Sequence, residues 1–100
     1  MSEIGGEETV TTARATFQIV NKLGMHARAA TKLVQLASKY RCEIELTHAG
    51  QSANAKSVMG VLLLCGSKGS RLEVVAKGEG AEEAVERIGE LIGNRFGEEE

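Results

Sequence analysis

The sequence predicts an α+β fold, an open-faced β-sandwich in which a four-stranded antiparallel sheet carries three helices on one face. Two observations predict it. Apolar residues alternate in four short segments and recur at helical spacing in three others, in the order βαββαβα. The chain also has 100 residues, which is the length of one domain with one modest core.

The first strand and the first helix flank a glycine turn. Residues 15–20 alternate, which places Phe17 and Ile19 on the inner face of a half-buried strand. Gly24 indicates the turn that follows. A helix is predicted from about residue 27 to residue 39, because good helix formers predominate there. Its apolar face comprises Ala30, Leu33, Val34, Ala37 and Tyr40.

The middle of the chain predicts a hairpin and a short apolar helix. Residues 42–47 alternate as a strand with one inward apolar face, and a turn at Gly50 returns the chain through residues 52–55. The next helix, residues 58–64, has more apolar side chains than a short helix can bury, so we expect some of them to be exposed. Ser57 precedes this helix and suits its N-cap.

The end of the chain supplies the fourth strand, residues 71–77, and the last helix. The apolar face of that helix is predicted to contain Ala81, Ala84, Val85, Ile88, Leu91, Ile92 and Phe96. Residues 98–100 are acidic, and we expect them to fray. The sequence thus divides into a flexible N-terminal extension (1–13), a folded domain (14–96) and an acidic C-terminal tail (97–100).

His26 lies at or near the N-cap of the first predicted helix, and the candidate chemistry lies there. The first N–H groups of a helix lack partners within it and carry the positive end of its dipole, so they bind anions. Imidazole is a nucleophile near neutral pH, which suits a reversible phosphoryl group on His26. Arg28 would add a forked cationic donor. The competing interpretation is an ordinary polar helix cap without chemistry.

Two segments resemble one known family. Residues 24–30, Gly-Met-His-Ala-Arg-Ala-Ala, resemble the active-site signature of the histidine-containing phosphocarrier (HPr) family of bacterial phosphotransferase systems. Residues 56–62, Lys-Ser-Val-Met-Gly-Val-Leu, resemble that family's regulatory-serine helix, and the similarity runs from about residue 15 to residue 96. Residues 21–26 are most similar to the nitrogen-related, NPr-like branch. One departure is Ala29, where the family usually has proline; alanine keeps the helix and restores an amide N–H.

The resemblance implies a carrier that forms a covalent intermediate, not a free-standing enzyme, with no cofactor and no metal. It implies that His26 accepts a phosphoryl group on Nδ1 from the phosphoenolpyruvate-dependent kinase enzyme I and passes it to an enzyme IIA-type acceptor. Arg28 and the backbone amides of Ala27, Arg28 and Ala29 would hold the phosphate, and the ring would be exposed. The implied docking surface for these partners comprises Met25, Ala27, Ala30, Thr31, Val58, Met59 and Leu62.

Two other functions are weighed against this one. The chain could be a regulatory binding module whose phosphorylation at His26 or Ser57 controls binding to a kinase, a transcription factor or a metabolic enzyme. In some relatives a dedicated kinase phosphorylates the serine that corresponds to Ser57, so the resemblance implies a serine kinase and phosphatase as further partners. A small-molecule-binding regulatory domain is the third function, and it would leave His26 and Arg28 without a role.

Composition narrows the partners and the compartment. Net charge is −3 over residues 1–8, +7 over 9–78 and −6 over 79–100, so the basic middle suits an acidic partner surface. Few aromatic residues and no dense basic cluster argue against nucleic acid. No apolar run approaches a membrane span, and the acidic start lacks a signal core, so we expect a cytoplasmic monomer without membrane insertion. Cys42 and Cys65 are then expected to be free thiols.

Overall fold

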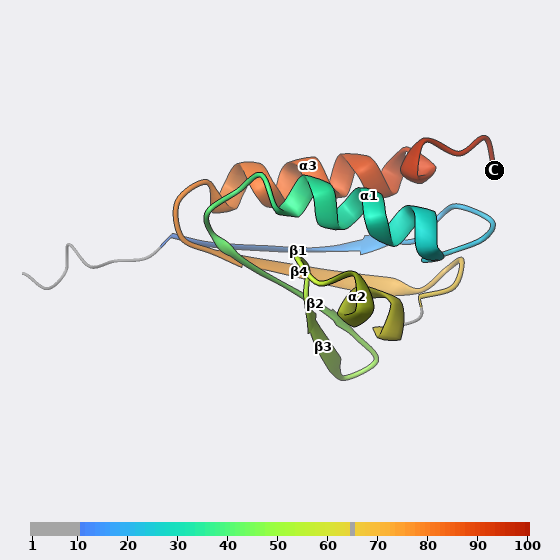
Figure 1. The fold of residues 1–100 in the computed structure, drawn as a ribbon, viewed down its shortest axis with the longest axis horizontal. Coiled ribbons are helices and arrows are strands. Elements are labelled where there is room, and N and C mark those ends of the chain that lie inside the picture. Colours follow the sequence, from blue (N-terminus) through green and yellow to red (C-terminus); the bar gives the residue numbers. More distant parts are fainter. Residues whose placement is uncertain (1–10, 65) are drawn as a thin grey trace, which may run out of the picture.

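The computed structural model describes residues 11–64 and 66–100, which form a sheet with helices over one of its faces (Figure 1). The predicted order βαββαβα is confirmed, and a short 3-10 turn follows the last helix. Residues 1–10 of the predicted N-terminal extension, and Cys65, lie outside the described residues. The elements are β1 (Thr12–Gln18), α1 (Ala27–Ala37), β2 (Glu43–His48), β3 (Gln51–Asn54), α2 (Val58–Leu64), β4 (Arg71–Lys77), α3 (Ala81–Gly93) and η2 (Arg95–Gly97).

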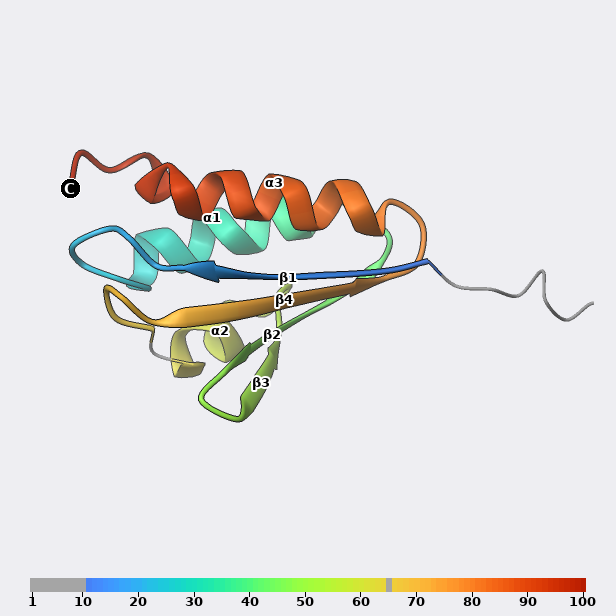
Figure 2. The same cartoon turned by 180° about the vertical axis from the view of Figure 1, so that it is seen from behind.

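The sheet is antiparallel and has four strands, as predicted. Its strand order is β1-β4-β2-β3. β4 pairs with β1 on one side and with β2 on the other, and Figure 2 shows β1 and β4 running together beneath α3. The last residue of β1, Gln18, is opposite the first residue of β4, Arg71. This register brings the loop after β1, which leads to His26, next to the loop before β4.

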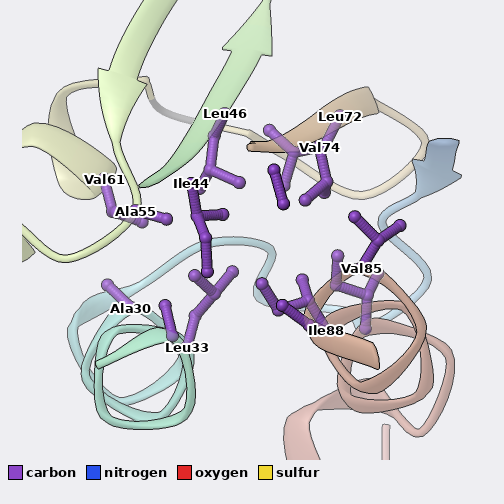
Figure 3. Close-up of a cluster of buried hydrophobic side chains, with 14 of the residues drawn as sticks. Ala30, Leu33, Ile44, Leu46, Ala55, Val61, Leu72, Val74, Val85 and Ile88 are labelled. Carbon is purple, nitrogen blue, oxygen red and sulfur yellow. The ribbon is translucent and has the colours of Figure 1, made fainter. Parts of the chain in front are cut away.

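The helices bury their apolar faces against one side of the sheet, which confirms the predicted layer arrangement. α1 and α3 lie side by side across it, and α2 packs against α1, β2 and β3 (Figures 1 and 2). Figure 3 shows side chains from α1 and α3 meeting side chains from β2 and β4 in one cluster. Fully buried members include Leu33, Leu46, Leu72, Val74 and Ile88. None of the helices in the described part is long and apolar enough to cross a membrane.

Element boundaries differ from the sequence prediction in small ways. β1 begins at residue 12, three residues before the predicted start, because every residue from Thr12 to Gln18 has a partner in β4. Ile19 is buried as predicted but belongs to the loop that follows β1. α1 ends at residue 37, two residues early, where the amide of Ser38 donates to the carbonyl oxygen of Val34.

The prediction that Phe96 continues the apolar face of α3 is wrong, although the residue is fully buried. α3 ends at Gly93, and Arg95 and Phe96 then adopt left-handed φ angles of 59° and 54°. This left-handed turn ends the helical path, and the Phe96 side chain is buried in the core. Lys32 of α1 secures it, because its ammonium group donates to the Phe96 carbonyl oxygen at 2.6 Å. The residues after Phe96 are therefore directed toward α1.

Candidate functional site

His26 is the N-cap residue of α1, as the sequence predicts. Its backbone is extended, with φ −98° and ψ −178°, and its carbonyl oxygen accepts the first helical bond from the amide of Ala30 at 2.8 Å. The ring turns back over the helix start, where the backbone N–H of Arg28 donates to Nδ1 at 3.3 Å. This distance is at the long end for a hydrogen bond, so the contact is weak and easily replaced. Nδ1 thus faces the positive end of α1.

The turn before His26 is held by backbone contacts and one buried amide side chain. Gly24 has a φ of +68°, a conformation that favours glycine, and the amide of Met25 donates to the carbonyl oxygen of Gly66 at 2.7 Å. Asn21 is fully buried, and its Nδ2 donates to the Gly24 carbonyl oxygen at 2.8 Å. Together these bonds fix the position from which α1 starts.

The three amides predicted to hold a phosphate belong to the first turn of α1, where helical geometry gives them no partner. Within the described residues, the Arg28 amide donates to Nδ1 of His26, and Ala27 and Ala29 belong to the same first turn, whose amides have no i−4 partner within the helix. Ala29 is fully buried, so its methyl group packs in the core while its N–H remains at the helix start. The Arg28 side chain is exposed. The start of α1 therefore provides unused donors beside Nδ1.

The other ring nitrogen of His26 faces the C-terminal segment, which corrects the expectation that residues 98–100 fray. Nε2 contacts the carboxylate of Glu98, and the Asn21 Nδ2 donates to the other oxygen of that carboxylate at 3.0 Å. The segment is also tied at its end, because the amide of Lys22 donates to the carbonyl oxygen of Glu100 at 2.5 Å. Figures 1 and 2 show the C-terminus at the same end of the molecule as the loop before α1.

This contact makes the ring less accessible than expected. The His26 side chain is 27% exposed, and that of Glu98 is 14% exposed. Burial alone would raise the pKa of the Glu98 carboxyl group. The hydrogen bonds from Asn21 and His26, together with the charges of His26 and Arg28, outweigh burial and hold this pKa below its ordinary value. Glu98 is therefore an ionised acceptor for Nε2 at neutral pH.

A hollow of about 450 Å³ lies beside this site and has charges of both signs around it. Its basic side chains come from the loop before α1 and from α1 itself, whereas its acidic side chains come from the C-terminal segment. The lining residues are Lys22, Leu23, Arg28, Lys32, Gly97, Glu98, Glu99 and Glu100. Arg28 lies beside both the hollow and the start of α1.

The structure divides the predicted docking residues. Ala27 and Thr31 of α1 are exposed, as are Val58 and Met59 of α2, and Leu62 is half-buried. The prediction that Met25 and Ala30 belong to the docking surface is wrong, because they are 8% and 0% exposed and pack in the hydrophobic core. Ala30 lies on the inward face of α1 with Leu33 and Ala37, so its side chain cannot meet a partner surface.

Ser57 caps α2, as predicted from its position before the apolar run. Its hydroxyl oxygen accepts a hydrogen bond from the amide of Gly60 at 3.1 Å. This is the usual N-cap bond to the third helical residue. The structure thus gives Ser57 a structural role in α2.

The sequence predicted exposed apolar side chains in α2, with Leu63 among the candidates, but it did not single out Leu23 or Glu98 for the site. Leu23 and Leu63 are 69% and 71% exposed, unusually so for leucine. Leu63 follows Met59 by four residues, which places both on one side of the helix. No sequence pattern indicates that Leu23 is exposed. The contact of Glu98 with His26 has no sequence signal, because it depends on the path of the chain after the left-handed turn at η2.

Comparison with known proteins decides the family. The family model described as the PTS HPr component phosphorylation site matches residues 13–94. The chain belongs to the HPr family. The phosphocarrier protein HPr of Xylella fastidiosa is 46% identical over 81 residues, which cover 81% of this chain and 91% of that protein. The phosphocarrier protein NPr of Shewanella violacea is 42% identical over 80 residues, which cover 80% and 88%.

The HPr fold is confirmed by solved structures. HPr of Thermoanaerobacter tengcongensis superposes with a TM-score of 0.85 and 40% sequence identity over 88% of this chain and 99% of that one. HPr of Bacillus anthracis superposes with a TM-score of 0.78 and 32% identity over 81% and 96%. The predicted family is therefore confirmed, relatives named HPr and NPr both match, and the chain has a general phosphocarrier role in a phosphotransferase system.

Proposed function

We propose that the chain carries a phosphoryl group on Nδ1 of His26, accepting it from enzyme I and passing it to an enzyme IIA-type domain. The observation that carries this proposal is the direction of Nδ1, which faces the amide of Arg28 at the start of α1. A phosphoryl group bonded to Nδ1 would replace the weak bond from Arg28 and accept hydrogen bonds from the same first turn. The amides of Ala27, Arg28 and Ala29 would hold it.

Charge at the site suits a group that is bound only for a time. The helix dipole contributes about 0.3–1 kcal/mol toward an anion at an exposed helix start. The exposed guanidinium of Arg28 adds a forked donor without a buried partner that must be displaced. Because neither interaction is buried, the phosphoryl group would be stabilised without being trapped. A carrier needs this balance, since it must both receive and release the group.

The partner surface would combine exposed apolar groups with the basic middle of the chain. We propose that Ala27, Thr31, Val58 and Met59 contact enzyme I and the acceptor, with Leu62 at the edge. Met59 is 68% exposed, which leaves a flexible apolar side chain available for contact with more than one partner. The net charge of +7 over residues 9–78 would steer acidic partner surfaces toward the site. We propose that these encounters take place in the cytoplasm, with the chain as a monomer.

The decisive experiment is phosphorylation by purified enzyme I with labelled phosphoenolpyruvate. Acid-labile label should appear on the wild type and should be absent from His26→Ala. The matched control is His48→Ala, which removes the other histidine of the chain and should be labelled normally. Label that persists on His26→Ala would refute the proposed site. Transfer from the isolated phosphoprotein to an enzyme IIA-type domain tests the second half of the proposal.

A regulatory binding module is the second candidate function, and the position of Ser57 favours it. Its hydroxyl group lies at the start of α2, directly before the exposed Val58 and Met59. A phosphate there would put charge beside the apolar side chains proposed to dock partners, and it would alter their binding. Onward transfer separates the candidates. A pure regulatory module would accept the phosphoryl group on His26 but would not pass it to any acceptor domain.

A further inference from the structure

The carboxylate of Glu98 is the only acidic group within the described residues that contacts the His26 ring. It is held from two sides, because it contacts Nε2 of His26 while its second oxygen accepts a hydrogen bond from Asn21 at 3.0 Å. Asn21 is fully buried and also donates to the carbonyl oxygen of Gly24 at 2.8 Å. One amide side chain therefore connects the turn before α1 to the C-terminal segment and sets the place of the carboxylate.

The two contacts of the ring require the same tautomer. A carboxylate is only an acceptor, so its contact with Nε2 places the proton on Nε2. The backbone N–H of Arg28 is only a donor, so its contact with Nδ1 requires an unprotonated Nδ1 with a free lone pair. Two groups that are far apart in the sequence thus select one protonation state of the neutral ring.

We propose that Glu98 is a positioning residue for phosphoryl transfer, because it keeps the proton on Nε2 and leaves the Nδ1 lone pair as the nucleophile. This inference rests on the proposed function of His26. The arrangement follows a general rule for histidine, in which a carboxylate bonded to one ring nitrogen orients the ring and makes the other nitrogen more basic. It also provides a negative charge where positive charge develops during the reaction.

The transfer step balances without any proton leaving the ring. The Nδ1 lone pair forms the N–P bond while the bond from phosphorus to the donor breaks, and that bond's electron pair stays on the donor. The ring keeps its Nε2 proton and becomes a phosphorylated imidazolium, whose positive charge the Glu98 carboxylate stabilises. When the group moves on to an acceptor, the N–P bond breaks and its electrons return to Nδ1. The starting tautomer is then restored.

The opposite role for Glu98 predicts opposite kinetics. Its carboxylate partly covers the ring, which leaves 27% of the His26 side chain exposed, and a cover could slow the encounter with enzyme I. The geometry favours positioning, because Glu98 contacts Nε2 whereas the proposed nucleophile Nδ1 is on the other side of the ring, at the helix start. A cover would be expected to lie over the reacting nitrogen.

The test compares Glu98→Ala and Glu98→Gln with Glu99→Ala, in the full chain with enzyme I and phosphoenolpyruvate. Glu99→Ala is the matched control, since it removes the same charge from an adjacent, exposed residue. We expect Glu98→Ala to slow phosphorylation about 10-fold. This is the lower end of the loss of activity found when the carboxylate partner of a metal-binding histidine is removed. Glu98→Gln keeps an oxygen acceptor for Nε2–H and should recover part of the rate. Glu99→Ala should match the wild type.

Nitrogen NMR of the His26 ring gives the readout that a structural role alone would not move. The long-range proton–nitrogen correlations of the neutral ring report which nitrogen carries the proton. In the wild type, Nε2 should be protonated, and in Glu98→Ala a substantial share of Nδ1–H should appear. Backbone amide spectra of each variant establish that the domain is folded.

Each outcome decides the proposal. Slower transfer together with a changed tautomer supports it, whereas an unchanged rate or an unchanged tautomer in Glu98→Ala overturns it. Faster transfer in Glu98→Ala would assign the carboxylate to a cover over the site and would also overturn it. Failure of the proposed function looks different, because the wild type itself would then acquire no label on His26.

Discussion

Gly24 is the position where one added methyl group should disturb both the fold and the proposed phosphoryl site. Its φ is +68°, where an L residue costs about 1–2 kcal/mol. A Cβ atom there would lie 2.5 Å from the carbonyl oxygen of Gly66 and 2.9 Å from the Cα of Ser67. These are backbone atoms, which no side-chain rotation can move. Overpacking of this kind costs about 1–3 kcal/mol, so Gly24→Ala should lose about 2–5 kcal/mol of unfolding free energy.

Gly50→Ala is the matched control for this substitution. Gly50 also has a left-handed φ, +81°, but a Cβ there would meet nothing within 4 Å. It should therefore lose only the conformational part, about 1–2 kcal/mol. Urea unfolding followed by circular dichroism measures both variants, provided that their slopes against denaturant agree. Equal losses in Gly24→Ala and Gly50→Ala would show that the contact with Gly66 has no energetic weight, and the reasoning would be refuted.

Gly24→Ala should also impair phosphorylation under conditions where the variant is folded. The turn at Gly24 sets the place of His26, and the Gly24 carbonyl oxygen accepts bonds from Asn21 and from the His26 amide at 3.0 Å. A shift of this turn would move Nδ1 away from the helix-start amides. The measurement is the rate of label transfer from enzyme I at low temperature and without urea, with Gly50→Ala as the folded reference.

Three further substitutions test the site separately. Arg28→Ala should slow transfer about 10-fold to 100-fold through loss of a charge-assisted hydrogen bond, and its thermal midpoint should stay unchanged because the side chain is exposed. Ser57→Ala should lose about 1 kcal/mol in urea unfolding through loss of the α2 cap; a loss no larger than that of Ser52→Ala would contradict this. Because folding lowers the pKa of Glu98, its ionised carboxylate stabilises the folded state at pH values above the ordinary pKa of 4.5. The stability advantage of the wild type over Glu98→Gln should therefore disappear as pH falls through that lowered pKa, and an advantage that persists in strong acid would exclude this linkage.

The sequence predicted those features that depend on local patterns. β4 has the predicted bounds, residues 71–77, because Leu72, Val74 and Ala76 alternate with residues of the opposite face and are buried. The N-cap position of His26 was predictable for a similar reason, since a glycine turn followed by good helix formers defines a helix start. The proposed phosphoryl acceptor and its nearest amides can therefore be predicted from one short stretch of sequence.

Other features depend on contacts between distant residues, which a local pattern does not encode. Phe96 fits the spacing of α3, but the left-handed turn at Arg95 and Phe96 places it outside that helix. Glu98, just after this turn, contacts a ring 72 residues earlier in the chain. Met25 shows the same limit, because its burial follows from the bond between its amide and Gly66, and the sequence around it gives no sign of this.

We propose that the groups around His26 act in two ways that together allow one small domain to hold a phosphoryl group and still release it. The backbone of α1 fixes donors beside Nδ1, and these donors cannot rearrange without unfolding the first turn. The acidic C-terminal segment is held by contacts with Asn21, Lys22 and the ring itself. Rigid donors favour the phosphorylated state by a modest amount, about 0.3–1 kcal/mol from the dipole. A carboxylate on the other nitrogen favours the ring's positive charge in that same state, and it does so without contacting the phosphoryl group. Since each contribution is small and only one touches the group, a partner that offers a better-matched site can remove it.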